Sequence, residues 1–419
     1  MPFASIQTPG RRFYAKLKDI SYTDYRRSDD IHGTVLYPAV MVAPVQKDVL
    51  KDLYKKDTIH SILDPFHGSG TALYESHRIF PYARIYGCDI NPLANLITKT
   101  KLSGVSANIQ REIQEVRQRI ERDDSTNIFE FHNRKKWFRD DIAQSLSKIR
   151  RAIIQVDNRD DRFFFWCMMC DVIRRYSNSR SSTYKLHIKP REKIEGMRDN
   201  SIDDFLQAAE ESFPLFENVH CKNYTLCKRD LIDYLPSFRN NKVDLLITSP
   251  PYGDNNTTVP YGLFSSLSLK WIAPQDLELE GWELDNYSVI DSHSLGNGRT
   301  CTALTNLQED LIGPYLSEIS DGKKTKVQKF FHAYFECLDL FTEIVQKYIV
   351  LTLGNRTVDR IKIDLADISG RYLRMKGFDE CQTISRAILN KRTPALTSRV
   401  QDGPVESMNK EYVLIYKKH

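Results

Sequence analysis

The first hundred residues alternate between short apolar runs, glycine- or proline-rich turns and segments of helical periodicity. Val45–Lys55 and Thr71–Ile79 have the spacing of amphipathic helices, whereas His60–Asp64 and Ala83–Asp89 are short apolar runs that end in an acid. A strand, a turn, a helix and a second strand in this order form the unit from which parallel α/β sheets are built. We therefore predict that such a sheet begins here.

The same alternation returns after residue 220. Apolar strands are predicted at Tyr224–Leu226, Lys242–Ile247 and Ile349–Leu353, with an amphipathic helix at Lys326–Tyr348 before the last of them. Glu411–Tyr416 is expected to form a final edge strand. The fold class predicted from both regions is α/β, with a doubly wound, mostly parallel sheet.

Residues between these two regions have a different character. Gln110–Arg122 and Asp141–Ile154 are long charged segments with apolar residues at helical spacing, and polar breaks separate them. We interpret residues 101–220 as a helical insertion. The catalytic core is then expected to comprise residues 1–100 and 221–419, with a loop-rich region of few periodic patterns at 273–325.

Composition narrows the class of protein only slightly. A chain of 419 residues with 41% hydrophobic and 27% charged residues has ordinary globular usage, and its net charge of +5 permits a nucleic-acid partner without requiring one. We expect a reduced, cytoplasmic protein without membrane association, because neither a secretory signal nor a long apolar span is evident. Cys167 and Cys170 have metal-binding spacing but sit in an apolar segment, which favours buried thiols.

The first sequence motif with chemical meaning is Asp64–Thr71, whose sequence is DPFHGSGT. Glycines directly after a strand allow a tight turn, and the helix that follows presents free N–H groups to an anionic ligand. Asp89 ends the next strand, where a carboxylate can accept both ribose hydroxyls. The three features together predict a cofactor of the nucleoside type.

The second motif is Thr248–Tyr252, with the sequence TSPPY, directly after the strand Lys242–Ile247. Two prolines force the chain to leave the sheet stiffly at the carboxyl end of the strand, which is the edge where open α/β sheets bind ligands. Such a turn can aim the Ser249 side chain and the Pro250 carbonyl at an amino group, with Tyr252 as a stacking face. A proline-rich loop with an ordinary surface tyrosine is the alternative.

Together the two motifs resemble the cofactor-binding and catalytic signatures of the amino-DNA methyltransferase family, in which Ser-Pro-Pro-Tyr is associated chiefly with cytosine N4. Ile31–Thr34 with Tyr37–Ala39, Cys227–Asp230, Leu351–Asn355 and Arg386–Arg392 resemble further core segments of that family. The resemblance implies a class I methyltransferase fold and S-adenosylmethionine as cofactor. It assigns cofactor binding to Tyr37, Pro38, Asp64, Phe66, Gly68, Gly70, Thr71, Asp89, Ile90 and Asp230, and catalysis to Ser249, Pro250, Pro251 and Tyr252.

The implied reaction is a direct methyl transfer to an exocyclic amino group. Ser249 and the Pro250 carbonyl would accept the amino hydrogens, and the target base would be flipped out of the duplex to stack on Tyr252. Asp254, Asn255 and Asn256 either line the base pocket or cap the next element, whereas Tyr261 and Phe264 are expected to pack. A carbon-5 cytosine mechanism is disfavoured because the chain contains no Pro-Cys dipeptide.

The partners we expect are double-stranded DNA and a cognate restriction endonuclease. Candidates for DNA recognition are the insertion, with Arg134–Trp137 and Arg174–Arg180, the region 273–325, and the Arg- and Tyr-rich residues 1–30. Solvated surface is the alternative for the insertion and for the N-terminal residues.

Several other functions remain open from the sequence. The glycine turn precedes Ser-Pro-Pro-Tyr, whereas many cytosine N4 enzymes have the opposite order, so adenine N6 is an alternative target. An RNA or protein amino methyltransferase, or a catalytically idle DNA-binding subunit with this fold, is also consistent with the motifs. A nicotinamide dehydrogenase would give Ser-Pro-Pro-Tyr no role.

Overall fold

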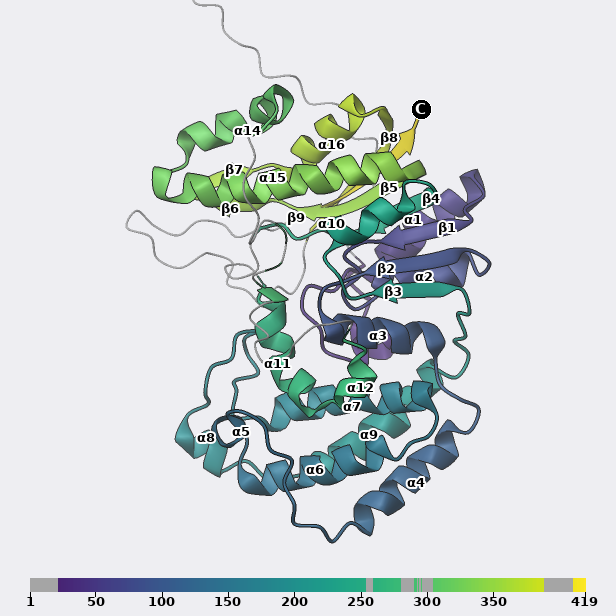
Figure 1. Ribbon diagram of the computed structural model, residues 1–419, viewed down its shortest axis with the longest axis vertical. Helices are drawn as coiled ribbons and strands as arrows, with labels where there is room; N and C mark the ends of the chain where they lie inside the picture. Colours follow the sequence, from purple (N-terminus) through teal and green to yellow (C-terminus); the bar gives the residue numbers. More distant parts are fainter. Residues whose placement is uncertain are drawn as a thin grey trace, which may run out of the picture.

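The described residues of this computed structural model are 22–253, 259–279, 290–291, 293, 295, 304–387 and 410–419, and a seven-stranded sheet forms their centre (Figure 1). Its strand order is β3-β2-β1-β4-β5-β9-β8. Neighbouring strands from β3 to β5 are parallel, and β9 is antiparallel to both β5 and β8. The predicted α/β class with a mostly parallel sheet is confirmed. The strands are β1 Ser61–Asp64, β2 Arg84–Cys88, β3 Tyr224–Cys227, β4 Val243–Thr248, β5 Val345–Gly354, β8 Phe378–Ala387 and β9 Lys410–Lys418.

Both faces of the sheet are buried, which explains the continuous apolar runs of its strands. Along β4, Leu245 and Ile247 pack with α1 and α2, whereas Leu246 between them packs with α15 on the opposite face. Ile62 and Leu63 of β1 divide between the faces in the same way. The covering helices are α1 Ala43–Lys56 and α2 Thr71–Ile79 on one face, and α10 Leu231–Tyr234, α14 Asn306–Glu318, α15 Asp321–Ile344 and α16 Leu365–Met375 on the other.

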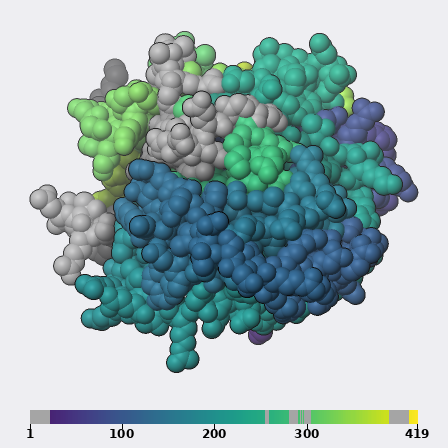
Figure 2. Space-filling view, turned by 60° about the horizontal axis from the view of Figure 1, so that its bottom comes forward, coloured from purple at the N-terminus to yellow at the C-terminus, as the bar shows by residue number. Residues whose placement is uncertain are grey.

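A helical lobe lies beside the β3 edge of the sheet, with α3 between lobe and sheet (Figure 1). Its central helix is α7, in which every residue from Phe163 to Cys170 is buried. Figure 2 shows the lobe covering the front of the molecule in that view. The intervening helix is α3 Pro92–Ser103. The helices of the lobe are α4 Ile109–Glu121, α5 Arg134–Trp137, α6 Asp140–Ile154, α7 Arg159–Tyr176, α8 Arg191–Glu195, α9 Ser201–Ser212, α11 Tyr261–Trp271 and α12 Pro274–Leu277.

Short elements complete the described chain. A two-stranded hairpin projects from the end of β5, and four short 3-10 helices connect larger elements. They are β6 Arg356–Val358, β7 Ile361–Ile363, η1 Arg27–Asp29, η2 Ile31–Gly33, η3 Phe213–Leu215 and η4 Leu235–Phe238. In the described parts of the chain, every helix is too short or too polar to cross a membrane.

The predicted helix Lys326–Tyr348 is wrong at its C-terminal end. The helix α15 ends at Ile344, and the next residues already belong to β5, where Val345 pairs with Val243 and Tyr348 with Leu245. Apolar residues at these positions suit either a buried helix or a buried strand. Pairing with β4, which is distant in sequence, decides between them.

Two further predictions about the C-terminal half need correction. Glu411–Tyr416 belongs to β9, which is not an edge strand, because it lies between β5 and the unpredicted strand β8. The region 273–325 is less loop-rich than expected: α14 begins with a capping box in which Thr305 and Gln308 bond each other's backbone N–H, and α15 follows at Asp321. The predicted loop Asn286–Gly298 falls largely outside the described residues.

Candidate functional site

The glycine turn connects β1 to α2 with two residues in the left-handed region. Gly68 has φ +50° and Gly70 has φ +75°, conformations that disfavour residues with a side chain. A Cβ at Gly70 would lie 2.6 Å from the Thr98 side chain, so this position also lacks room. The sequence DPFHGSGT therefore forms the tight turn that the sequence analysis predicted.

The His67 side chain, which the sequence analysis did not single out, bonds the backbone of this turn. His67 is buried, with Nδ1 2.9 Å from the Gly68 carbonyl oxygen and Nε2 3.2 Å from Asn95 Oδ1. Thr98 Oγ1 also donates to the Gly68 carbonyl at 3.0 Å. Helix α3 thus fixes the shape of the turn through side chains that are distant from it in sequence.

Asp89 follows β2 and lies directly beside the glycine turn. Its carboxylate accepts the Gly68 N–H at 2.9 Å through Oδ2 and the Asn91 N–H at 2.8 Å through Oδ1. Burial raises the pKa of this carboxyl group, and the two backbone donors oppose that shift. Each oxygen keeps a second lone pair, so the carboxylate can still accept two hydroxyl groups.

Asp64, which the family resemblance assigns to cofactor binding, does not line the cavity described below. Its side chain is fully buried, and Oδ1 accepts hydrogen bonds from Thr248 Oγ1 at 2.6 Å and from the Phe66 N–H at 3.1 Å. Burial raises the pKa of Asp64 to about 7. This side chain therefore joins the carboxyl ends of β1 and β4, which positions the two predicted motifs relative to each other.

The Ser-Pro-Pro-Tyr turn leaves β4 on the other side of this junction. Ser249 Oγ lies 3.0 Å from the Tyr252 hydroxyl, which donates to the Thr352 carbonyl of β5 at 3.4 Å. Burial raises the pKa of Tyr252 well above its usual value, so this hydroxyl stays neutral at physiological pH. The turn is thus tied to the neighbouring strand through its last residue.

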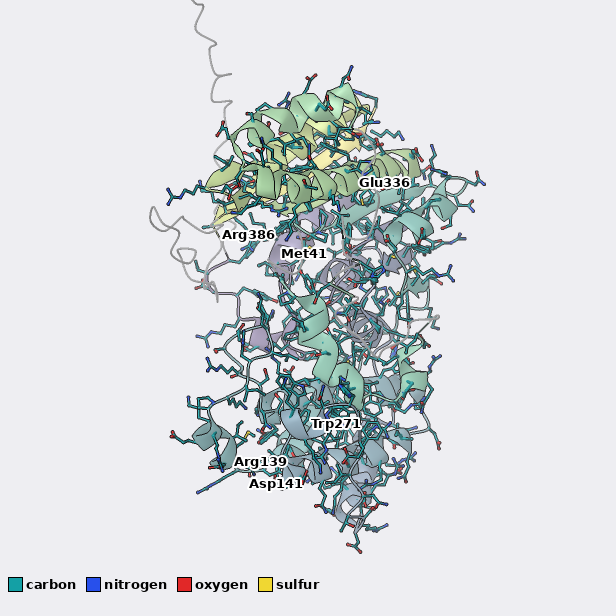
Figure 3. The ribbon with its side chains drawn as sticks, turned by 60° about the vertical axis from the view of Figure 1, so that its left-hand side comes forward. Met41, Arg139, Asp141, Trp271, Glu336 and Arg386 are labelled. Atoms are coloured by element: carbon teal, nitrogen blue, oxygen red, sulfur yellow. The ribbon has the colours of Figure 1, made fainter. Side chains whose placement is uncertain are left out.

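Both motifs line one cavity of about 660 Å³ at the carboxyl edge of the sheet. Met41, which also lines it, lies between the layer of α14–α16 and the lobe that contains Arg139 and Asp141 (Figure 3). Of the predicted site residues, only Asp64 and Gly70 do not line this cavity. The residues that line it are Tyr37, Pro38, Phe66, Gly68, Thr71, Asp89, Ile90, Asp230, Ser249, Pro250, Pro251 and Tyr252. This volume falls within the usual range for small-molecule sites.

Further residues of the cavity wall were outside the sequence-based site. Tyr261 was expected to pack, and its ring does stack on Tyr37 at 5.8 Å between centroids, yet it also lines the cavity. Phe264 is buried as expected. Lys323, Arg356 and other residues of α15 and the β6–β7 hairpin form the opposite wall, and no local motif indicated them. Asp254, Asn255 and Asn256 lie outside the described residues.

Much of the basic sequence in the helical lobe is engaged within the chain. Arg134 is buried and forms ion pairs with Glu130 and Asp140, and Arg175 pairs with Asp204 at 2.6 Å. Arg174 is also buried, with its guanidinium 4.3 Å from the centre of the Phe264 ring. These three arginines are engaged with partners inside the lobe, which their local sequence did not indicate.

The cysteine pair of the lobe belongs to the core. Cys167 and Cys170 are buried in α7, and burial raises the pKa of the Cys167 thiol to about 12. Cys221 and Cys227 are buried as well. The prediction of buried thiols agrees with this placement.

A buried lysine, Lys101, bonds the backbone of the glycine turn. Lys101 is 1% exposed, and its Nζ donates to the Ser69 carbonyl at 2.8 Å. Burial lowers the pKa of Lys101 to about 7, whereas a lysine in an unfolded chain titrates near ~10.4. Between these values the unfolded chain binds a proton that the folded chain does not, so this group makes stability rise with pH from 7 towards 10.

Replacing Lys101 with methionine should remove this pH dependence. Between pH 7 and 9, the unfolding free energy of wild type should rise relative to that of Lys101→Met by roughly 1 kcal/mol per pH unit. Urea unfolding of both proteins across this range measures the slope, with the exposed Lys56→Met as the control that should show none. A difference that does not vary with pH would contradict the burial of a titrating ammonium group.

Comparison with known proteins adds one relative of similar length. No family model matches the chain. The chain is similar to the type II methyltransferase M.MvaI of Kocuria varians, with 27% identity over 425 residues that cover 93% of this chain and 91% of that protein. Two solved structures of the rRNA methyltransferase aviRa from Streptomyces viridochromogenes align over 93% of this chain and 92% and 93% of theirs, with 10% and 9% identity and TM-scores of 0.31 and 0.32.

Proposed function

We propose that this chain, a methyltransferase by its similarity to a type II methyltransferase, transfers a methyl group from S-adenosylmethionine to an exocyclic amino group of a flipped base in DNA, with cytosine N4 as the preferred target. The observation that carries the proposal is the shared cavity. The glycine turn with Asp89 and the Ser-Pro-Pro-Tyr turn line the same space of about 660 Å³, and Asp64 joins the strands from which they emerge.

The residues at the β1 and β2 ends fit the proposed cofactor. Thr71 Oγ1, in the first turn of α2, is buried without a hydrogen-bond partner among the described residues, and the free N–H groups of this helix end suit a carboxylate. Asp89 would accept the ribose hydroxyls, and Asp230 at the start of α10 lines the cavity where the adenine would lie. When bound, the cofactor supplies an electrophilic methyl group on a sulfonium.

The Ser-Pro-Pro-Tyr turn supplies what an amino acceptor needs. The lone pair of an exocyclic amine is delocalised into its ring, and hydrogen bonds from the amino group to Ser249 Oγ and the Pro250 carbonyl would favour a more tetrahedral nitrogen. Tyr252 provides a ring for the base to stack on, and its neutral hydroxyl holds Ser249. Holding the nitrogen in line with the methyl group provides much of the acceleration.

The cytosine part of the proposal rests on the motif, and the DNA part rests on the motif and on the type II designation of the relative. Ser-Pro-Pro-Tyr resembles the cytosine N4 form, and a type II designation is the one used for methyltransferases of restriction–modification systems, which would provide a cognate endonuclease as partner. Adenine N6 is the second candidate, because the glycine turn precedes the catalytic turn here.

Two adjacent segments of the lobe offer a surface for the DNA backbone. We call residues 132–137 and 178–189 the basic loop pair; Asn178 joins them by donating from its backbone N–H to the Trp137 carbonyl at 2.6 Å. Neither segment contains an acidic residue. Both lie at the end of the lobe with α5 and α8 (Figure 1). Lys135, Lys136, Arg180 and Lys185 are exposed, and Tyr184 contacts Phe264 in the helix that begins at the cavity.

Removing charges from the basic loop pair should weaken DNA binding in a salt-dependent way. Lys135→Ala/Lys136→Ala should lower the slope of log affinity against log salt by about 1 for each phosphate contact that is lost. The matched control is Lys55→Ala/Lys56→Ala, a lysine pair that is also exposed and lies at the end of α1, near the amino end of β1 and so away from the cavity at the carboxyl ends. Equal slopes for wild type and the loop variant would remove this surface from the proposal.

The decisive test is expression in a bacterial host without DNA methylation of its own. Sequencing that distinguishes N4-methylcytosine from N6-methyladenine should reveal N4-methylcytosine at one short sequence motif and none with Ser249→Ala. N6-methyladenine at a motif would keep the reaction and change the base. Unmethylated host DNA, together with a DNA transfer assay using labelled cofactor that is also negative, would refute the DNA substrate.

A further inference from the structure

The order of strands divides the cavity into a cofactor side and an acceptor side. Apart from Tyr37 and Pro38, the proposed cofactor residues that line the cavity follow β1, β2 and β3, and the catalytic turn follows β4. Strand β5 lies on the far side of β4 from these three strands, with Thr248 paired to Leu351. Residues that leave the end of β5 therefore face the acceptor rather than the cofactor.

Asn355 is the first residue after β5, and it lies in the wall of the cavity. This part of the chain lies against the catalytic turn: Tyr252 bonds the Thr352 carbonyl, and the Arg356 guanidinium lies so close to Gly253 that a Cβ there would be 3.0 Å from it. Asn355 is 7% exposed, and its Oδ1 is shielded from solvent without a hydrogen-bond partner among the described residues.

Oδ1 is the shielded end of the Asn355 amide, so Nδ2 is the end that a ligand in the cavity can reach. By contrast, Asn91, which lines the same cavity, and Asn95 of α3 use both ends of their amides within the chain. The Asn355 Nδ2 can therefore donate to a ligand that sits beside Ser249.

We infer that Asn355 is a specificity-determining residue that binds the ring edge of the target base. This inference rests on the proposed function. With the amino group held by Ser249 and the Pro250 carbonyl, the Asn355 amide donates from Nδ2 to the ring nitrogen next to that amino group, which is N3 of cytosine or N1 of adenine. Thymine carries an N–H at this ring position. Its N–H would face the Asn355 N–H, two donors without an acceptor, so the site would reject thymine.

The test combines variants of Asn355 with a change in the base. Asn355→Ala and Asn355→Asp, which keeps the shape but loses the donor, should lower kcat/KM on the mapped DNA site by about tenfold or more, with unchanged cofactor affinity by calorimetry. The substrate is then made with the deaza analogue that lacks the ring nitrogen. This change should slow wild type about tenfold further than it slows Asn355→Ala, because the variant has already lost the contact.

The outcomes separate this inference from the proposed function. Asn240→Ala, an exposed asparagine before β4, is the matched control and should behave as wild type on both substrates. If Asn355→Ala retains normal kcat/KM, or if the deaza base slows wild type and variant by the same factor, Asn355 does not bind the ring nitrogen although the reaction stands. If wild type methylates no DNA at all, both the reaction and the inference fall.

Discussion

Ser249→Ala should lower kcat by roughly 100- to 1,000-fold, the usual loss when one positioned hydrogen-bonding group is removed from a reacting centre. Ser249 Oγ is held by Tyr252 at 3.0 Å and lines the cavity, so its loss leaves the amino nitrogen planar and poorly nucleophilic. Single-turnover transfer of labelled methyl groups measures the rate constant. Affinity for the cofactor should not change, because the cofactor residues follow other strands.

Variants of Tyr252 separate the two roles of the turn. Tyr252→Phe keeps the ring and loses the bond to Ser249, so it should reduce turnover less than Tyr252→Ala, which also loses a stacking face worth ~1–3 kcal/mol. Ser317→Ala, in an exposed part of α14, controls for the loss of a serine hydroxyl. Normal turnover in Ser249→Ala or Tyr252→Ala would exclude the catalytic role given to this turn.

Gly70→Ala should destabilise the protein by about 2–5 kcal/mol and abolish measurable cofactor binding. The left-handed backbone at φ +75° costs an alanine ~1–2 kcal/mol, and the new Cβ would lie 2.6 Å from Thr98, an overlap that costs a further ~1–3 kcal/mol. Relief of this overlap would shift the turn that presents Gly68 to the cavity. Urea unfolding and calorimetric titration with the cofactor measure the two effects.

The control for this prediction is another glycine. Gly322 lies in the first turn of α15 with open space around it, so Gly322→Ala should stabilise the protein by ~0.5–1 kcal/mol. Combining Gly70→Ala with Thr98→Ala should restore part of the stability, because Thr98→Ala removes the Cγ2 and Oγ1 atoms that the new Cβ would overlap. Full additivity of the two substitutions would contradict a direct contact between them.

The geometry of the proposed site depends on hydrogen bonds that join distant parts of the chain. Asp64 bonds Thr248 across β1 and β4, Asp89 bonds the backbone of Gly68, and Tyr252 bonds the carbonyl of Thr352. Each link fixes one motif relative to the next strand. The rigid sheet thus keeps the proposed methyl donor and acceptor at a constant separation.

The sequence alone determined the parallel α/β sheet and the two turns at its carboxyl edge, because apolar periodicity, Gly-x-Gly and Pro-Pro act over a few neighbouring residues. It placed most of the candidate site residues in one cavity, because parallel strands end at the same edge.

Tertiary structure alone decided everything that requires a partner from far along the chain. Pairing with β4 turned residues 345–348 into strand, and β8 placed β9 inside the sheet. Burial against Phe264 made Arg174 a core residue, while the missing partner of Asn355 became visible only once β5 stood beside the catalytic turn. Local sequence sets which conformations a segment prefers, but the burial and charge that a side chain experiences depend on neighbours that only the folded chain brings close.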